Sequence, residues 1–101
     1  MSADSATVVH RVDLNRFEIA AEGLRCELLY RINGPVMHLF RTFVPPALEG
    51  RGMAAALVAA AMDHARATGL RIAPDCSYVR TWLQRHPEHH DLWAPDAAGP
   101  I

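Results

Sequence analysis

Apolar and polar residues alternate near the start of the chain with a period of two. The apolar positions are Phe17, Ile19 and Ala21, and polar or small residues separate them. Because successive side chains of a strand point to opposite faces of a sheet, this pattern predicts a half-buried strand. Residues 1–14, which precede it, form either a frayed start or a first edge strand.

Two further strands follow, separated by a turn. Residues 25–32 (RCELLYRI) alternate in the same way, and residues 36–44 (VMHLFRTFV) are long and apolar enough for a central strand. Between them, residues 33–35 (NGP) favour a tight hairpin turn, since Asn and Gly tolerate positive φ angles. Three strands joined by short turns predict an antiparallel meander. The residues expected to share one face of the second strand are Cys26, Leu28 and Tyr30.

The hydrophobic period changes to that of a helix after Pro45 and Pro46, which end the third strand. Apolar residues then recur four positions apart, at Leu57 and Ala61 among others. They predict one apolar stripe along a helix over residues 53–67. The polar residues expected to face water are Asp63, His64 and Arg66.

A short strand and a short helix complete the pattern. Gly69 suits a left-handed helix cap, and residues 70–74 (LRIAP) predict a strand that a right-handed crossover would pair in parallel. Residues 77–85 predict a second helix, with Ser77 as its N-cap and Pro87 beyond its end. The predicted fold class is therefore α/β (α+β), with an antiparallel meander, a strand–helix–strand crossover and a short second helix.

Composition limits the class of protein. The 101 residues suffice for one domain, and a net charge of −1 argues against a general nucleic-acid binder. The longest apolar run, residues 53–62, is too short to cross about 30 Å of hydrocarbon. Cys26 and Cys76 provide no disulfide framework, and residues 1–14 lack a signal-peptide pattern. We therefore expect a cytoplasmic protein, monomeric or homodimeric, with no nucleic-acid or membrane partner.

The folded domain is expected to cover residues 15–93. Residues 1–14 would form an N-terminal segment, and residues 94–101 (APDAAGPI) a disordered tail. Three histidines lie near this end, but their HPEHH spacing is not a standard zinc pattern, so we expect no metal site.

The most informative segment is LEGRGMA, residues 48–54, at the mouth of the predicted first helix. Gly50 and Gly52 lack Cβ atoms, so an anion can approach the backbone there. The first turn of a helix has unpaired N–H groups and a partial positive charge, which together form an anion site. A pyrophosphate would fit, although a plain turn would use the same glycines. The segment matches neither the P-loop nor the dinucleotide GxGxxG pattern.

From about residue 36 to residue 92 the chain resembles the small GCN5-related N-acetyltransferase-like family, of the YjdJ type. The matching features are the two prolines after the strand, Gly-Arg-Gly-Met-Ala at the helix start, Gly-Leu after the helix, and then Pro-x-Cys-x-Tyr and Arg-His-Pro. The broader superfamily has a phosphate motif, Gln/Arg-x-x-Gly-x-Gly/Ala. Gly52 and Ala54 match its last two fixed positions, whereas Glu49 stands at the first.

This resemblance implies acetyl-CoA, or another acyl-coenzyme A, as ligand and an amine as acceptor. The third strand and the strand after Leu70 would diverge at their ends. Backbone groups of Thr42, Phe43 and Val44 would then hydrogen-bond to the pantetheine arm, which would lie against them like an added strand. The residues implied at the phosphates are Gly50, Arg51, Gly52, Met53, Ala54 and Ala55.

Two residues after the last strand are candidates for catalysis. Cys76 lies where a helix dipole can lower a thiol pKa, so it would take the acyl group covalently or line the thioester pocket; a small packing residue is the alternative. Tyr78 would either protonate the departing thiolate or pack against the first helix. His38 and His86 are further candidates for proton transfer.

The function implied by the resemblance is that of an acetyl-CoA-dependent N-acetyltransferase. Its acceptor would be an amine of a small molecule, a protein lysine or an N-terminus. The alternatives are a non-catalytic module that binds coenzyme A or an acyl-CoA, and a small interaction domain whose glycines are only structural. The chain looks too short for the two helices that usually follow the first strand in full-length acetyltransferases, so we expect an open acceptor groove.

Overall fold

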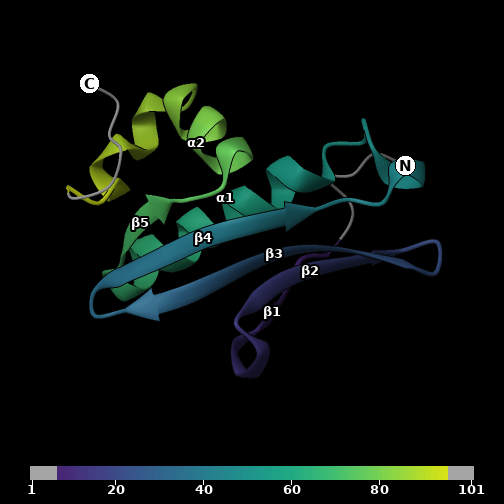
Figure 1. The fold of residues 1–101 in the computed structure, drawn as a ribbon, viewed down its shortest axis with the longest axis horizontal. Coiled ribbons are helices and arrows are strands. Elements are labelled where there is room, and N and C mark those ends of the chain that lie inside the picture. Colours follow the sequence, from purple (N-terminus) through teal and green to yellow (C-terminus); the bar gives the residue numbers. More distant parts are fainter. Residues whose placement is uncertain (1–6, 96–101) are drawn as a thin grey trace.

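The strands form one sheet in the order in which they follow each other along the chain. The computed structural model describes residues 7–95. Within this range the sheet has five strands, in the order β1-β2-β3-β4-β5 (Figure 1). Pairing is antiparallel from β1 to β4 and parallel between β4 and β5, which confirms the predicted meander and crossover. The strand bounds are β1 Val9–Arg11, β2 Arg16–Ala21, β3 Leu24–Asn33, β4 Val36–Phe43 and β5 Arg71–Pro74.

Helices connect and cover these strands. The α-helices of the described residues are α1 Met53–Thr68 and α2 Ser77–Gln84, and short 3-10 turns span Val12–Leu14, Pro46–Leu48 and Pro87–Leu92. Gly69 has a φ of 75° and donates its N–H to the Ala65 carbonyl, so the predicted left-handed cap is confirmed. The predicted N-cap of α2 is wrong by one residue: Cys76, with an extended backbone, holds that position, and Ser77 is already helical.

One face of the sheet packs against α1, which lies behind β4 in Figure 1. The apolar stripe of α1, including Leu57 and Ala61, is fully buried. On β3 and β4, buried residues stand at alternate positions, as the period-two pattern predicts. Those that form the core with α1 include Phe17, Ile19, Cys26, Leu28, Tyr30, Met37 and Leu39.

The edge strand β1 is anchored by an aromatic cluster. His10 stacks on Phe17 with ring centroids 4.1 Å apart, and its Nε2 lies 2.8 Å from the Tyr30 hydroxyl. The ring of His64, on α1, meets His10 edge-on at 4.5 Å. His64 is therefore half-buried over the sheet edge rather than facing water as predicted. Burial, and then the nearby His64, lower the pKa of His10.

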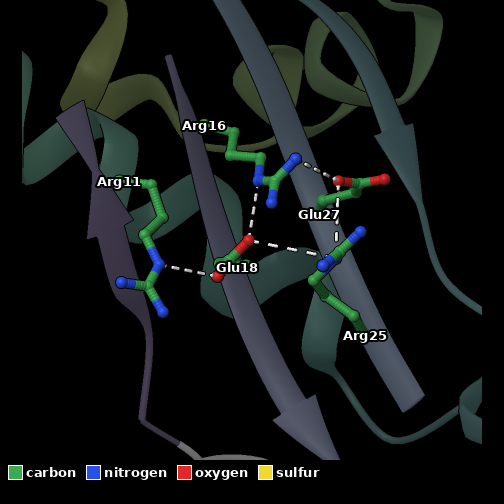
Figure 2. Close-up of polar contacts among 5 residues, drawn as sticks. All are labelled: Arg11, Arg16, Glu18, Arg25 and Glu27. Carbon is green, nitrogen blue, oxygen red and sulfur yellow. Dashed lines mark hydrogen bonds and ion pairs between the residues drawn. The ribbon is translucent and has the colours of Figure 1, made fainter. Parts of the chain in front are cut away.

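Over β1, β2 and β3 the opposite face of the sheet carries a network of ion pairs (Figure 2). The Glu18 carboxylate accepts hydrogen bonds from Nε of Arg11 at 2.9 Å and Nε of Arg16 at 2.7 Å. Arg25 lies 3.9 Å from Glu18 and 3.8 Å from Glu27. These arginines cover Glu18 so well that it is 8% exposed. The network joins all three strands.

The chain returns to β5 at its C-terminal end. The Ala94 N–H donates to the Ile72 carbonyl at 2.7 Å, and Ala94 is buried. Residue 94 therefore does not belong to the predicted disordered tail, because it closes the core beside β5; residues 96–101 lie outside the described residues. No helix in the described part of the chain is both long and apolar enough to span a membrane.

Glu18 is expected to stabilise the fold in a pH-dependent way. The hydrogen bond from Arg11, and then that from Arg16, lower the pKa of Glu18 below its ordinary value of 4.5, against the effect of burial. Glu18→Gln removes the charge, so it should lower the free energy of unfolding at pH 7 by about 1–3 kcal/mol, the scale of charged hydrogen bonds. Urea denaturation measures this difference.

The stabilising effect of Glu18 depends on pH. A lowered folded-state pKa contributes stability above the unfolded pKa, and this stability is lost as the pH falls through the folded value. The difference between Glu18→Gln and the native chain should therefore shrink below about pH 4.5. Asp63→Asn, which removes an exposed charge on α1, is the matched control. A difference that stays constant down to pH 2 would contradict the network's role.

Candidate functional site

The two parallel strands end at different levels. β5 ends at Pro74, opposite Leu39, whereas β4 continues to Phe43. The last bond between the two segments runs from the Cys76 N–H to the Leu39 carbonyl, at 2.9 Å. Beyond it, residues 40–43 have no strand partner on the β5 side among the described residues. The divergence expected from the family resemblance is therefore present.

A β-bulge redirects β4 at this point. Leu39 pairs with Tyr30 and Arg41 with Leu29, so Phe40 is an extra residue without a partner on β3. Bulges bend the strand that contains them and re-aim its side chains. After the bulge, Thr42 pairs with buried Leu28, and the Thr42 hydroxyl lies 3.5 Å from the sulfur of Cys76.

A cavity of about 620 Å³ opens between the end of β4 and the start of α1. This volume lies within the range of small-molecule sites. The cavity brings together residues that are up to 36 positions apart, from Thr42 to Tyr78. The predicted coenzyme-binding residues that line it are Thr42, Phe43, Val44, Gly50, Gly52, Met53, Ala54 and Ala55.

The first turn of α1 presents backbone N–H groups to this cavity. Gly52 is the N-cap, with φ 80° and ψ 12°, and no side chain caps the helix. The first bond of the helix runs from the Ala56 N–H to the Gly52 carbonyl, at 3.0 Å. The N–H groups of Met53, Ala54 and Ala55 therefore have no partner within the helix.

The two glycines are required by their backbone conformation. Gly50 has a φ of 79° and Gly52 a φ of 80°, values that other residues adopt only with strain. A Cβ at Gly50 would meet no atom within 4 Å, so glycine is required there by the backbone conformation rather than by crowding. The same glycines therefore form both a turn and a possible anion-binding site, because the turn leaves the start of the helix uncapped.

Charges near the helix start are arranged differently from the sequence prediction. The Arg51 guanidinium pairs with Glu22, at the β2–β3 turn, and donates to the Ala47 carbonyl at 3.4 Å. Arg51 alone of the predicted coenzyme-binding residues does not line the cavity, because that carboxylate draws it outward. Glu49 lines the cavity and is exposed. The seat therefore consists of backbone dipoles rather than cationic side chains.

Cys76 lies behind Thr42 at the diverging end of β5, and does not line the cavity. Burial acts to raise the pKa of its thiol. Hydrogen bonds from the Thr42 hydroxyl and from backbone N–H groups at the start of α2 outweigh this effect and hold the pKa below its ordinary value. Cys76 is partly buried against the core, so it combines the packing role with a polarised sulfur.

Tyr78 faces the cavity and is 40% exposed. The alternative that it packs in the core against the first helix is therefore wrong; α2 buries Val79 and Leu83 instead. Burial of the phenol raises the pKa of Tyr78, so the hydroxyl stays protonated at neutral pH and can donate a proton.

The histidine candidates lie away from this cavity. His86 Nδ1 bonds the Trp82 carbonyl at 2.6 Å, and its ring stacks on Trp82 at 3.7 Å, which gives it a structural role at the end of α2. His38 lies on the other side of the sheet from the core and pairs with Asp75. The lining residues that sequence reasoning missed are Pro46 and Leu48; nothing in their local pattern marks them, since the 3-10 turn places them.

The chain matches a known family over most of its length. Residues 16–92, more than half of the chain, match the model of the family described as GCN5-related N-acetyl-transferase. This protein belongs to the GCN5-related N-acetyltransferase family. Its fold is similar to the NMR solution structure of a GCN5-like putative N-acetyltransferase from Staphylococcus aureus. The identity is 25%, the TM-score is 0.70, and the match covers 87% of each chain.

Proposed function

We propose that this acetyltransferase-family protein transfers the acetyl group of acetyl-CoA to a primary amine. One observation carries the proposal: uncapped N–H groups at the start of α1 line the same cavity as the end of β4. The first feature suits a diphosphate, because helix N-termini carry partial positive charge. The second suits an extended arm that hydrogen-bonds to a strand edge. Coenzyme A contains both chemical groups.

The residues present fit this ligand. The amides of Met53, Ala54 and Ala55 would hold the diphosphate, and the small side chains of the two alanines leave room for it. The backbone of residues 42–44 would hold the pantetheine arm. Glu49 opposes a bound diphosphate electrostatically, but it is exposed, so water screens its charge. Backbone recognition does not depend on the side chain at that position.

Acetyl-CoA supplies the acetyl group as a thioester, which is activated toward amines. The chain's own residues would then manage the protons. Tyr78, protonated at neutral pH and facing the cavity, would donate its hydroxyl proton to the departing sulfur. Cys76 would act as a positioning residue through Thr42, because its sulfur lies behind Thr42 and not on the cavity wall.

A second candidate is a module that binds coenzyme A without turnover. β1 and β2 are joined by the 3-10 turn Val12–Leu14, in the place where full-length acetyltransferases resembled by the sequence have two helices. Those helices usually help to form the acceptor site. The short turn in place of those helices favours an open acceptor side and leaves coenzyme A binding without catalysis as the alternative.

A reducing compartment such as the cytoplasm would suit the free thiols of Cys26 and Cys76.

Ala54→Glu should abolish coenzyme A binding without unfolding the protein. Ala54 lines the cavity in the first turn of α1, where an acidic residue stabilises a helix. Two like charges about 4 Å apart repel by several kcal/mol when partly screened, so affinity should fall at least about 100-fold. Isothermal titration calorimetry with coenzyme A measures the affinity, and circular dichroism checks the fold.

Ala67→Glu is the matched control, because Ala67 is exposed on the same helix and far from the cavity. Its affinity for coenzyme A should equal that of the native chain. Gly52→Glu is a poorer probe, since a side chain at φ 80° strains the backbone in its own right. Native affinity in a folded Ala54→Glu variant would rule out the diphosphate seat.

Release of free thiol from acetyl-CoA across a panel of primary amines separates the enzyme from the binding module. The enzyme should release thiol only when an amine is present, and Tyr78→Phe should slow turnover by about 100-fold or more while coenzyme A affinity is kept. Binding of coenzyme A with no thiol release for any amine would favour the module. Unchanged turnover in Tyr78→Phe would remove the proposed proton donor.

A further inference from the structure

A second cavity lies on the side of β4 that faces away from the core. Its volume is about 300 Å³, and it is formed between β4, the end of β5 and the segment around Ala94. His38 and Asp75 both line it, and Nδ1 of His38 lies 3.0 Å from Oδ2 of Asp75. Met37 and Leu39, on either side of His38, point into the core, so the imidazole stands on the opposite face.

This pair lies on the two strands that diverge toward the coenzyme cavity, although neither residue lines that cavity. His38 precedes Leu39, whose carbonyl accepts the Cys76 N–H, and Asp75 precedes Cys76. In the proposed binding mode the arm leaves the start of α1 and runs back along β4, from Val44 toward Thr42. Its reacting end therefore points along β4 toward His38. The two cavities approach the diverging strands from opposite faces of the sheet.

The His38–Asp75 geometry is that of an oriented base. A carboxylate that accepts the Nδ1 proton of an imidazole holds the tautomer in which Nε2 has a free lone pair. Within residues 7–95 the structure gives Nε2 of His38 no hydrogen-bond partner. Asp75 is exposed and His38 is half-buried, so solvent and small ligands can reach the pair.

The negative charge of Asp75 favours a cationic ligand at the part of this cavity that Asp75 lines. Asp75 is the carboxylate among its described lining residues, and Asn33 adds an uncharged polar side chain. Arg31 pairs across the strands with His38, but its guanidinium lies over the Phe40 ring, 4.8 Å from the centroid. Arg71, on β5, is exposed and stands two residues before Ala73, the partner of His38.

We propose that this second cavity receives the primary alkylammonium group of the acceptor and that His38, held by Asp75, accepts its proton. The proposal rests on the acetyl transfer proposed above and names its acceptor side. A cavity of about 300 Å³ has room for an unbranched alkylammonium group. Asp75 is a positioning residue in this scheme, and His38 a catalytic base.

The ammonium group gives one proton to Nε2 of His38, and the amine nitrogen forms a C–N bond with the acetyl carbon while the C–S bond breaks. The nitrogen loses a second proton to water. The departing sulfur takes one proton from the Tyr78 hydroxyl, which is restored from solvent. His38 returns its proton to water, so each turnover releases one proton in total.

The binding step can be tested without coenzyme A, by NMR titration of the full chain with butylammonium chloride. We expect shifts of the His38 imidazole signals and of the Asp75 and Ala73 amides, and at least a tenfold loss of affinity in Asp75→Asn. Butanol, which has the same shape without the charge, should bind at least tenfold more weakly. Asp63→Asn, an equal change of charge on α1, should bind like the native chain.

Two probes distinguish the sources of the alkylammonium group. If Nα-acetyl-lysine N-methylamide, whose ε-ammonium group is free, binds as well as butylammonium, peptide lysines fit the cavity. If only butylammonium binds, the acceptor is a free amine. Either result supports the proposal. Shifts centred elsewhere, or equal affinity in Asp75→Asn, would overturn it.

The base is tested by turnover with butylamine and acetyl-CoA. His38→Gln should lower kcat by about 100-fold or more and leave coenzyme A affinity unchanged. A native rate in His38→Gln, or no turnover in the native chain despite binding of both ligands, would overturn the assignment. If coenzyme A itself fails to bind while butylammonium still does, the proposed acetyl transfer fails and the ammonium site remains.

Discussion

The site depends on a helix that begins without a cap. Most helices satisfy some of their first N–H groups with the side chain of a Ser, Thr, Asp or Asn residue. In α1 the N-cap is Gly52, which has no side chain, and small alanines follow after Met53. The amides of the first turn are therefore left for a ligand, and the turn conformation that requires glycine is the same feature that exposes them.

The sheet supplies the second half of the site by failing to pair. β5 stops at Pro74, and the bulge at Phe40 turns the rest of β4, so a strand edge is left open beside the uncapped helix. The same divergence brings Cys76 to Thr42 on one face and Asp75 to His38 on the other. The core under α1 and the ion pairs of β1, β2 and β3 hold this arrangement in place.

Much of this was predictable from residue patterns, because periodicity and turn residues act locally. The meander, α1 and the cap at Gly69 follow from alternation, a four-residue repeat and one glycine. The exceptions arise from tertiary contacts: His64 packs on His10, Arg51 turns to Glu22, and Ala94 bonds to Ile72. His38 was a candidate for proton transfer from the sequence, but its partner Asp75 was not, since Asp75 lies 37 positions away and parallel pairing brings the two together.

The central claim is that peptide amides at the start of α1 hold the diphosphate of coenzyme A. Amide chemical shifts of the isotope-labelled chain, titrated in parallel with coenzyme A and with pantetheine, test it most directly. The account predicts that coenzyme A shifts the amides of residues 50–55 and 42–44, whereas pantetheine, which has no diphosphate, shifts only those of residues 42–44. Binding of coenzyme A that leaves the amides of residues 50–55 unmoved would contradict it.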